Sequence, residues 1–186
     1  IIDWVYERCN TTEIGDIWVT TSLADADDAI VSWCERSDIN YVRGPESNLL
    51  KRHLMVADKA GADTVIRING DCPFVPPAEI YRVYDIYRNN NPHYTTNQTG
   101  TVPHGINVDI IPTEVLRRLN SEGHSHPVLP LREADENTTF TESTDWNGFT
   151  APELTLDTPS DYWRFVDAVD AVGGGSRGVV RLVVEE

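Results

Sequence analysis

The sequence predicts an α/β fold: a three-layer sandwich in which helices cover both faces of a mostly parallel β-sheet. Short runs rich in β-branched residues alternate along the chain with amphipathic segments of helical period, and the connections between them are short. Such alternation is typical of parallel strands joined by right-handed crossovers. From about residue 93 to 150 the rhythm changes to strands separated by turn-rich stretches, which indicates an antiparallel insertion.

Helices are expected where apolar residues recur at helical spacing, at residues 1–9, 24–37, 47–61, 76–91, 112–119 and 158–172. Strands are expected at residues 16–22, 39–44, 63–68, 93–97, 106–111, 139–144 and 152–157. The helix at 47–61 has Ser47 or Asn48 as a candidate cap and Gly61 as its stop. A glycine-rich hinge at 173–178 precedes a last strand-like run at 179–186.

The charge balance excludes some classes of partner. The 186 residues suffice for one domain with a sizeable core. Their formal net charge is -15, from 30 acids against 15 bases. Nucleic acids and anionic membranes bind positive patches, so we expect neither as a partner. Lysine is scarce, and a strongly acidic surface suits high salt, so we expect either a halophilic protein or an acidic mesophilic one.

Features of the chain also suggest a compartment. Cys9, Cys34 and Cys72 show neither paired nor metal-ligand spacing, so free thiols in a reducing cytoplasm are expected. No apolar run approaches the roughly 18 residues that a membrane span needs, and no signal peptide is recognisable. We therefore expect a cytoplasmic protein.

Two acids follow predicted strands directly: Asp71 after "VIRING" and Asp157 after "ELTL". The carboxyl ends of parallel strands meet at one sheet edge, where α/β proteins bind ligands. Mg²⁺ prefers one or two carboxylates together with phosphate and water oxygens, so the pair is a candidate metal site. Both acids also suit turns and helix starts, and that second interpretation stays open.

Three ordered motifs carry a family resemblance: "VIRINGDCPFVPPAEI", "YTTN" followed by "VPHGINVDII", and "LTLDTPSDYWRFV". The chain resembles the cytidylyltransferase family that includes the spore-coat polysaccharide enzymes and, more distantly, the synthetases of CMP-sialic acid and CMP-3-deoxy-manno-octulosonate. The likeness covers most of residues 16–172. It implies a Rossmann-like sheet of the nucleotide-diphospho-sugar transferase type.

The resemblance also implies a chemistry, the transfer of CMP from CTP to a hydroxyl of a sugar or sugar acid with release of pyrophosphate. Asp71 and Asp157 would hold Mg²⁺, and Arg67 would orient Asp71 or contact phosphate, unless it simply extends from its strand to the sheet edge. The residues that would face the acceptor sugar are Asn97, His104, Gly105, Asn107 and Asp109. His104 can equally be a surface turn histidine.

One departure from the family changes the expectation. Family members begin with a strand and a glycine-rich loop containing Arg and Lys, and no such segment precedes Ile1. We therefore expect residues 1–172 to form an incomplete cytidylyltransferase domain, inactive as given, with an apolar slot in its sheet. The tail at 179–186 would take a sheet position in its own chain or in a swapped homodimer, or else form a disordered tail or an added edge strand. A decayed, non-catalytic module that binds a sugar, a nucleotide or a protein is the alternative, and a glycosyltransferase of the same sheet type is a third reading.

Overall fold

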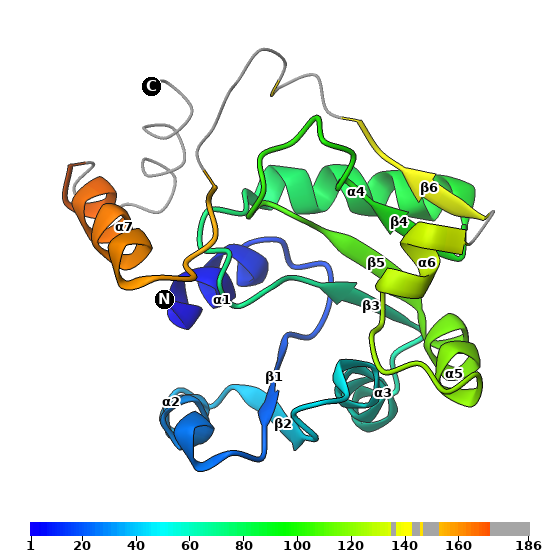
Figure 1. The fold of residues 1–186 in the computed structure, drawn as a ribbon, viewed down its shortest axis with the longest axis horizontal. Coiled ribbons are helices and arrows are strands. Elements are labelled where there is room, and N and C mark those ends of the chain that lie inside the picture. The colour runs from blue at the N-terminus through cyan, green and yellow to red at the C-terminus, as the bar shows by residue number, and fades with distance from the viewer. Residues whose placement is uncertain (135–136, 143–145, 147–152, 172–186) are drawn as a thin grey trace.

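The computed structural model describes residues 1–134, 137–142, 146 and 153–171 (Figure 1). Its strands are β1 (Trp18–Ser22), β2 (Asn40–Gly44), β3 (Thr64–Arg67), β4 (Tyr94–Thr96), β5 (Asp109–Pro112) and β6 (Thr138–Phe140). Its helices are α1 (Ile2–Asn10), α2 (Asp28–Arg36), α3 (Leu49–Ala60), α4 (Pro77–Asn90), α5 (Thr113–Ser121), α6 (Leu129–Ala134) and α7 (Pro159–Ala171), with a 3₁₀ turn, η1 (Asp25–Asp27), before α2.

The described strands form two sheets. β1 and β2 pair in parallel, and the second sheet has the order β3-β5-β4-β6. In that sheet β5 runs antiparallel to both β3 and β4, whereas β4 and β6 are parallel. The predicted α/β class is confirmed, and so is the change of rhythm after residue 93. The described pairing is mixed rather than mostly parallel, because antiparallel β5 enters between β3 and β4.

Helices pack on both faces of the larger sheet, as the alternation of side chains in a strand allows. On one face, Val65 and Ile111 join a core formed with α3 and α5 that includes Leu50, Leu54 and Leu116. On the other face, Ile66 and Ile110 pack with α4 residues such as Ile80, Val83 and Tyr87. The predicted three layers therefore exist around this sheet.

Local signals set the ends of α3 as the sequence predicts. The side chain of Asn48 accepts a hydrogen bond from the Lys51 backbone N–H at 2.8 Å, so Asn48 is the cap and Ser47 is not. Gly61 follows the helix with φ 64°, the left-handed conformation that glycine adopts without a steric penalty. These contacts fix where β3 can begin.

A cavity of about 490 Å³ separates the two sheets. Its walls include Trp18 and Thr20 of β1, Ile66 of β3, and Val5 and Tyr6 of α1. Within the described residues, β1 pairs only with β2, and β3 pairs only with β5. Apolar side chains make up much of the lining of this cavity.

Helix α7 lies beside α1 in Figure 1, at the opposite side of the molecule from α5. The contact is aromatic: the rings of Trp4 and Phe165 meet edge to face with centroids 5.3 Å apart, and Phe74 meets Phe165 in the same manner at 5.6 Å. Phe74 follows β3 by a few residues. This packing therefore holds the middle of α7 against α1 and against the loop that follows β3.

One expected strand does not form, and one helix was not expected. Residues 153–157 form no strand, because their backbone N–H groups bond to two different loops instead of one ladder. Helix α6 was not predicted, since "HPVLPLREA" is short and contains two prolines. The hinge at 173–178 and the tail at 179–186 lie outside the described residues, as does part of the expected strand at 139–144.

Candidate active site

The Asp71 loop follows the end of β3 and precedes α4. Its turn is closed by the Cys72 N–H, which donates to the carbonyl of Asn69 at 3.2 Å. The buried Cys72 thiol donates to Asp71 Oδ1 at 3.2 Å. Burial, followed by the carboxylates of Asp71 and Asp157, raises the pKa of Cys72, so the thiol stays protonated and remains a donor. Cys72 is therefore a structural support for Asp71 and not a nucleophile.

Residues 153–157 bridge two loops of the site. The Leu154 N–H donates to the carbonyl of His104, and the Leu156 N–H donates to the carbonyl of Asp71, both at 2.9 Å. The second bond places the segment carrying Asp157 directly beside the Asp71 loop. The structure thus brings together two chain segments that lie more than eighty positions apart in the sequence.

Asp157 stands exposed at the start of α7. Its Oδ2 accepts a hydrogen bond from the Thr155 hydroxyl at 2.6 Å, and its N–H donates to Asp161 at 3.2 Å. Asp161, the third residue of α7, also accepts from the Thr158 N–H at 2.8 Å, and its own N–H donates to the Thr158 hydroxyl at 3.3 Å, so the two residues form a capping box with Thr158 as the cap. Hydrogen bonds from Thr158 and Arg164 lower the pKa of Asp161 to about 2. The cap fixes the backbone that carries Asp157.

Gly105 allows the closest approach in the site. Its φ is 100°, and a Cβ built on it would lie 2.4 Å from the carbonyl carbon of Leu154. Any side chain here would collide with backbone, so the loop can touch the 153–157 segment only with glycine. Next to it, His104 Nδ1 lies 3.0 Å from Glu153 Oε1, with both side chains exposed.

Asn97 directly follows β4, Asn107 lies two residues before β5, and both are buried. Asn97 donates to Glu79 Oε1 at 2.7 Å and to the carbonyl of Ile106 at 3.0 Å, and its Oδ1 accepts from the Val108 N–H at 2.8 Å. Its polar groups are thus used inside the protein. Asn107 Oδ1 has no hydrogen-bond partner among the residues that the structure describes.

Asp109 is the most heavily bonded of the predicted site residues, and only 1% of it is exposed. Arg67 Nη1 donates to its Oδ2 at 2.8 Å, and Arg132 Nη2 donates to Oδ1 at 3.0 Å. The hydroxyls of Tyr94 and Thr96 donate to Oδ1 at 2.5 and 2.9 Å. Burial alone would raise the pKa of Asp109, but Arg132, Arg67 and Tyr94 outweigh it and hold that pKa below the usual value.

Arg67 has a partner that the sequence does not predict. It pairs with Asp109 across the β3–β5 ladder. Sequence reasoning missed Arg132 altogether. It lies 23 positions from Asp109 on a helix that was not predicted, so no local pattern could have linked the two.

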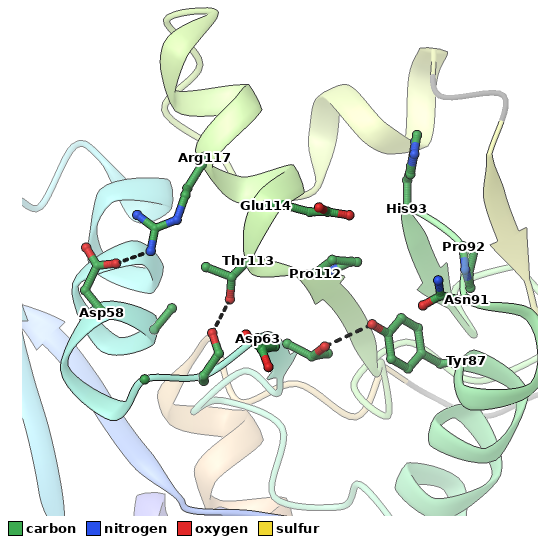
Figure 2. A pocket seen from close by; sticks show the side chains of 14 residues that line it. Asp58, Asp63, Tyr87, Asn91, Pro92, His93, Pro112, Thr113, Glu114 and Arg117 are labelled. Atoms are coloured by element: carbon green, nitrogen blue, oxygen red, sulfur yellow. Dashed lines mark hydrogen bonds and ion pairs between the residues drawn. The ribbon is translucent and has the colours of Figure 1, made fainter.

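A second pocket, of about 660 Å³, lies at the opposite edge of the sheet, where β3 begins and β5 ends (Figure 2). Its visible bonds tie elements together: Thr64 to Tyr87 at 2.9 Å, the Thr113 hydroxyl to the Ala62 carbonyl at 2.6 Å, and Arg117 to Asp58. Asp71 follows the other end of β3. We therefore place the candidate active site at the Asp71 edge.

The fold is that of nucleotidyltransferases. A cytidylyltransferase from Leptospira borgpetersenii superposes with a TM-score of 0.86 at 19% identity, over 99% of this chain and 82% of that one. A CMP:2-keto-3-deoxy-manno-octonic acid synthetase in complex with CTP superposes with a TM-score of 0.60 at 17% identity, over 91% of this chain and 87% of that one. At these identities the likeness shows the fold alone.

The sequence defines the family. The family model described as cytidylyltransferase matches residues 1–165, so the chain belongs to that family. The spore coat polysaccharide biosynthesis protein SpsF of Bacillus subtilis is 27% identical over 154 residues, which cover 77% of this chain and 62% of SpsF. An uncharacterised protein of Methanocaldococcus jannaschii is 28% identical over 99 residues, 53% of this chain and 41% of that protein. The chain thus spans less than two thirds of either curated relative.

None of the helices in the described part of the chain combines the length and the apolar character that crossing a bilayer requires.

Proposed function

We propose that this chain forms the core of a cytidylyltransferase that moves CMP from CTP to a hydroxyl of a sugar or sugar acid and releases pyrophosphate. Family membership supports the class of reaction. The single observation that carries the proposal is the Leu156–Asp71 hydrogen bond, which sets the segment bearing Asp157 beside the loop bearing Asp71. Two carboxylates in segments that meet beyond the C-terminal end of β3 suit a metal-bound triphosphate.

Asp71 and Asp157 are the residues proposed to hold Mg²⁺. Asp71 is half-buried and Asp157 is exposed. Cys72 donates to one oxygen of Asp71, and Thr155 donates to one oxygen of Asp157. Across the described residues no cluster of three or more His, Cys, Asp or Glu could hold a metal, so phosphate and water oxygens would complete the shell. The bound ion would supply neutralisation of the charge on the phosphates.

The acceptor is proposed to bind along the loop from His104 to Asn107. This loop lies against Leu154, two residues before the Leu156 N–H that donates to Asp71. The Oδ1 of Asn107 is buried without a hydrogen-bond partner among the described residues, which is costly. A sugar hydroxyl that donates to this oxygen would remove that cost. Its position supports the expectation that this loop contacts the acceptor.

We further propose that residues 1–186 by themselves transfer little CMP. The cavity between β1 and β3 supports this, because a strand in that space would join the two sheets and could carry a nucleotide-binding loop to the Asp71 edge. The alternative, a non-catalytic module that binds a sugar, a nucleotide or a protein, predicts that the product of the complete reading frame is equally inactive.

The test is pyrophosphate release with CTP, Mg²⁺ and a panel of sugars and sugar acids. We expect activity from the product of the complete reading frame and negligible activity from residues 1–186. In the active protein, Asp71→Asn and Asp157→Asn should each lower the rate by about a hundredfold or more. Asp58→Asn, at the far edge of the sheet, should leave the rate unchanged. Full activity of residues 1–186 would refute the second proposal, and an inactive complete protein that still binds these ligands would favour the module.

A further inference from the structure

A local excess of positive charge surrounds Asp109. The chain as a whole carries 30 acids and 15 bases, yet here Arg67 and Arg132 both pair with one carboxylate. The charged groups that act on the neighbouring His126 are these two arginines and Asp109. Two guanidinium groups against one carboxylate leave a net charge of +1, in a protein whose surface is otherwise strongly acidic.

Asp109 orients the two arginines but cannot reach a ligand itself, because it is buried and both of its oxygens accept hydrogen bonds. Arg132 is held a second time, by its Nε donating to the Tyr94 hydroxyl at 2.9 Å. Each guanidinium has five N–H donors. Arg67 uses its Nη1 in these bonds, and Arg132 uses its Nε and Nη2. In the described part of the chain, neither residue has a buried donor that lacks a partner. The remaining donors therefore reach solvent.

His126 adds a neutral donor in the loop that leads into α6, the helix that carries Arg132. Its Nδ1 accepts hydrogen bonds from the N–H groups of Val128 and Leu129, both at 3.2 Å, so the ring proton lies on Nε2. Burial and then Arg67 and Arg132 lower the pKa of His126, which keeps the ring neutral near pH 7. The loop is anchored to α3, since the Leu50 N–H donates to the Ser125 carbonyl at 2.9 Å.

This cluster borders the candidate metal site. Arg67 is the last residue of β3, and the Asp71 loop follows it. A ligand held near the two carboxylates could therefore extend an anionic group toward Arg67 and Arg132.

We propose that Arg67 and Arg132, oriented by Asp109 and assisted by Nε2 of His126, bind an oxyanion of the substrate, either the carboxylate of a sugar acid or a phosphate of the nucleotide. Guanidinium groups match both, because their planar pairs of N–H donors fit two oxygens at once. The identity of these substrates rests on the proposed function; the presence of an oxyanion site does not.

The test measures binding by the 186-residue chain at constant ionic strength. The probes are inorganic phosphate, 3-deoxy-manno-octulosonate, neutral mannose and CTP with Mg²⁺, titrated calorimetrically. Arg132→Lys keeps a charge next to Asp109 but loses the planar donor pair, and His126→Asn keeps an acceptor for the Val128 and Leu129 N–H groups but loses the Nε2 donor. Arg117→Lys, in the exposed pair with Asp58, is the matched control.

We expect Arg132→Lys to weaken phosphate binding about tenfold, His126→Asn to weaken it less, and the control to have no effect. An equal loss for the sugar acid, with CTP unaffected, would identify the carboxylate as the ligand group, and the reverse would identify a nucleotide phosphate. The site would be overturned if the protein binds none of phosphate, sugar acid and CTP. It would also be overturned if Arg132→Lys and His126→Asn both leave the binding of all three unchanged. A protein that binds phosphate through Arg132 but transfers no CMP in the complete form would refute the proposed function and leave the oxyanion site standing.

Discussion

Arg67 and Asp109 are directly opposite one another in the β3–β5 pair, and Arg67 Nη1 donates to Asp109 Oδ2 at 2.8 Å. The pair joins two predicted site residues that the sequence analysis had assigned to separate roles. Because Arg132 shares the same carboxylate, strand β3, strand β5 and helix α6 are held by one buried acid.

Removal of that acid's charge should be strongly destabilising. Asp109→Asn leaves Arg67 and Arg132 without their anionic partner, and breaking a buried ion pair on one side typically costs about 3–5 kcal/mol. Urea unfolding at pH 7 measures the loss. Asp58→Asn removes an acid from an exposed pair with Arg117 and should cost at most about 1 kcal/mol. Similar values for the two variants would show that the Asp109 cluster contributes little.

The contact at Gly105 predicts a second large effect. In Gly105→Ala the new methyl group would lie 2.4 Å from the Leu154 backbone at φ 100°, so the bridging segment must move. We expect a loss of about 3 kcal/mol or more in the free energy of unfolding. Gly61→Ala, at φ 64° in open space, should cost only about 1 kcal/mol. If Gly105→Ala is no worse than Gly61→Ala, the segment is not held as tightly as we describe.

Buried His53 predicts a pH dependence of stability. Burial first, and then the charges of Arg67, Arg52 and His126, lower the pKa of His53 to about 4, against an unfolded value near 6.5. Between these values the unfolded chain binds a proton that the folded protein does not. The contribution of His53 to the free energy of unfolding is therefore fully present above pH 6.5. It is lost as the pH falls toward 4, by up to about 3 kcal/mol.

Urea unfolding of the parent protein and of His53→Leu at pH 7 and pH 4.5 isolates this effect. The variant should lose less stability on acidification than the parent protein. Some dependence should remain in the variant, because the pKa of His126 is lowered as well. Equal losses in both proteins would exclude His53 as a source.

The net charge of -15 predicts a response to salt. Repulsion between surface acids should weaken as the screening length falls to about 3 Å in molar salt, so the thermal midpoint should rise from low to molar KCl. Thermal melts in KCl measure this, with sucrose as a control that leaves charges unscreened. A midpoint that stays constant or falls with salt would remove the halophile interpretation.

Much of the fold could be predicted because its signals are local. The Gly61 stop and the prolines at the start of α4 act within one helical turn, so the sequence alone placed those ends, and it narrowed the cap of α3 to Ser47 or Asn48. The α/β class follows from the same alternation of patterns. The prediction of a strand at 152–157 was wrong. "ELTL" has the composition of a strand, but its N–H groups bond to two loops that lie far away in the sequence.

The sequence by itself determined the class of fold and the family motifs, because each depends on composition or spacing within a short window. Only the tertiary structure decided which side chains meet. It paired Arg67 with Asp109, added Arg132 from a helix with no clear sequence signal, and set Asp157 beside the Asp71 loop through one backbone hydrogen bond. These are contacts between residues far apart in the chain, and their energy depends on burial and charge that arise only when the layers pack together.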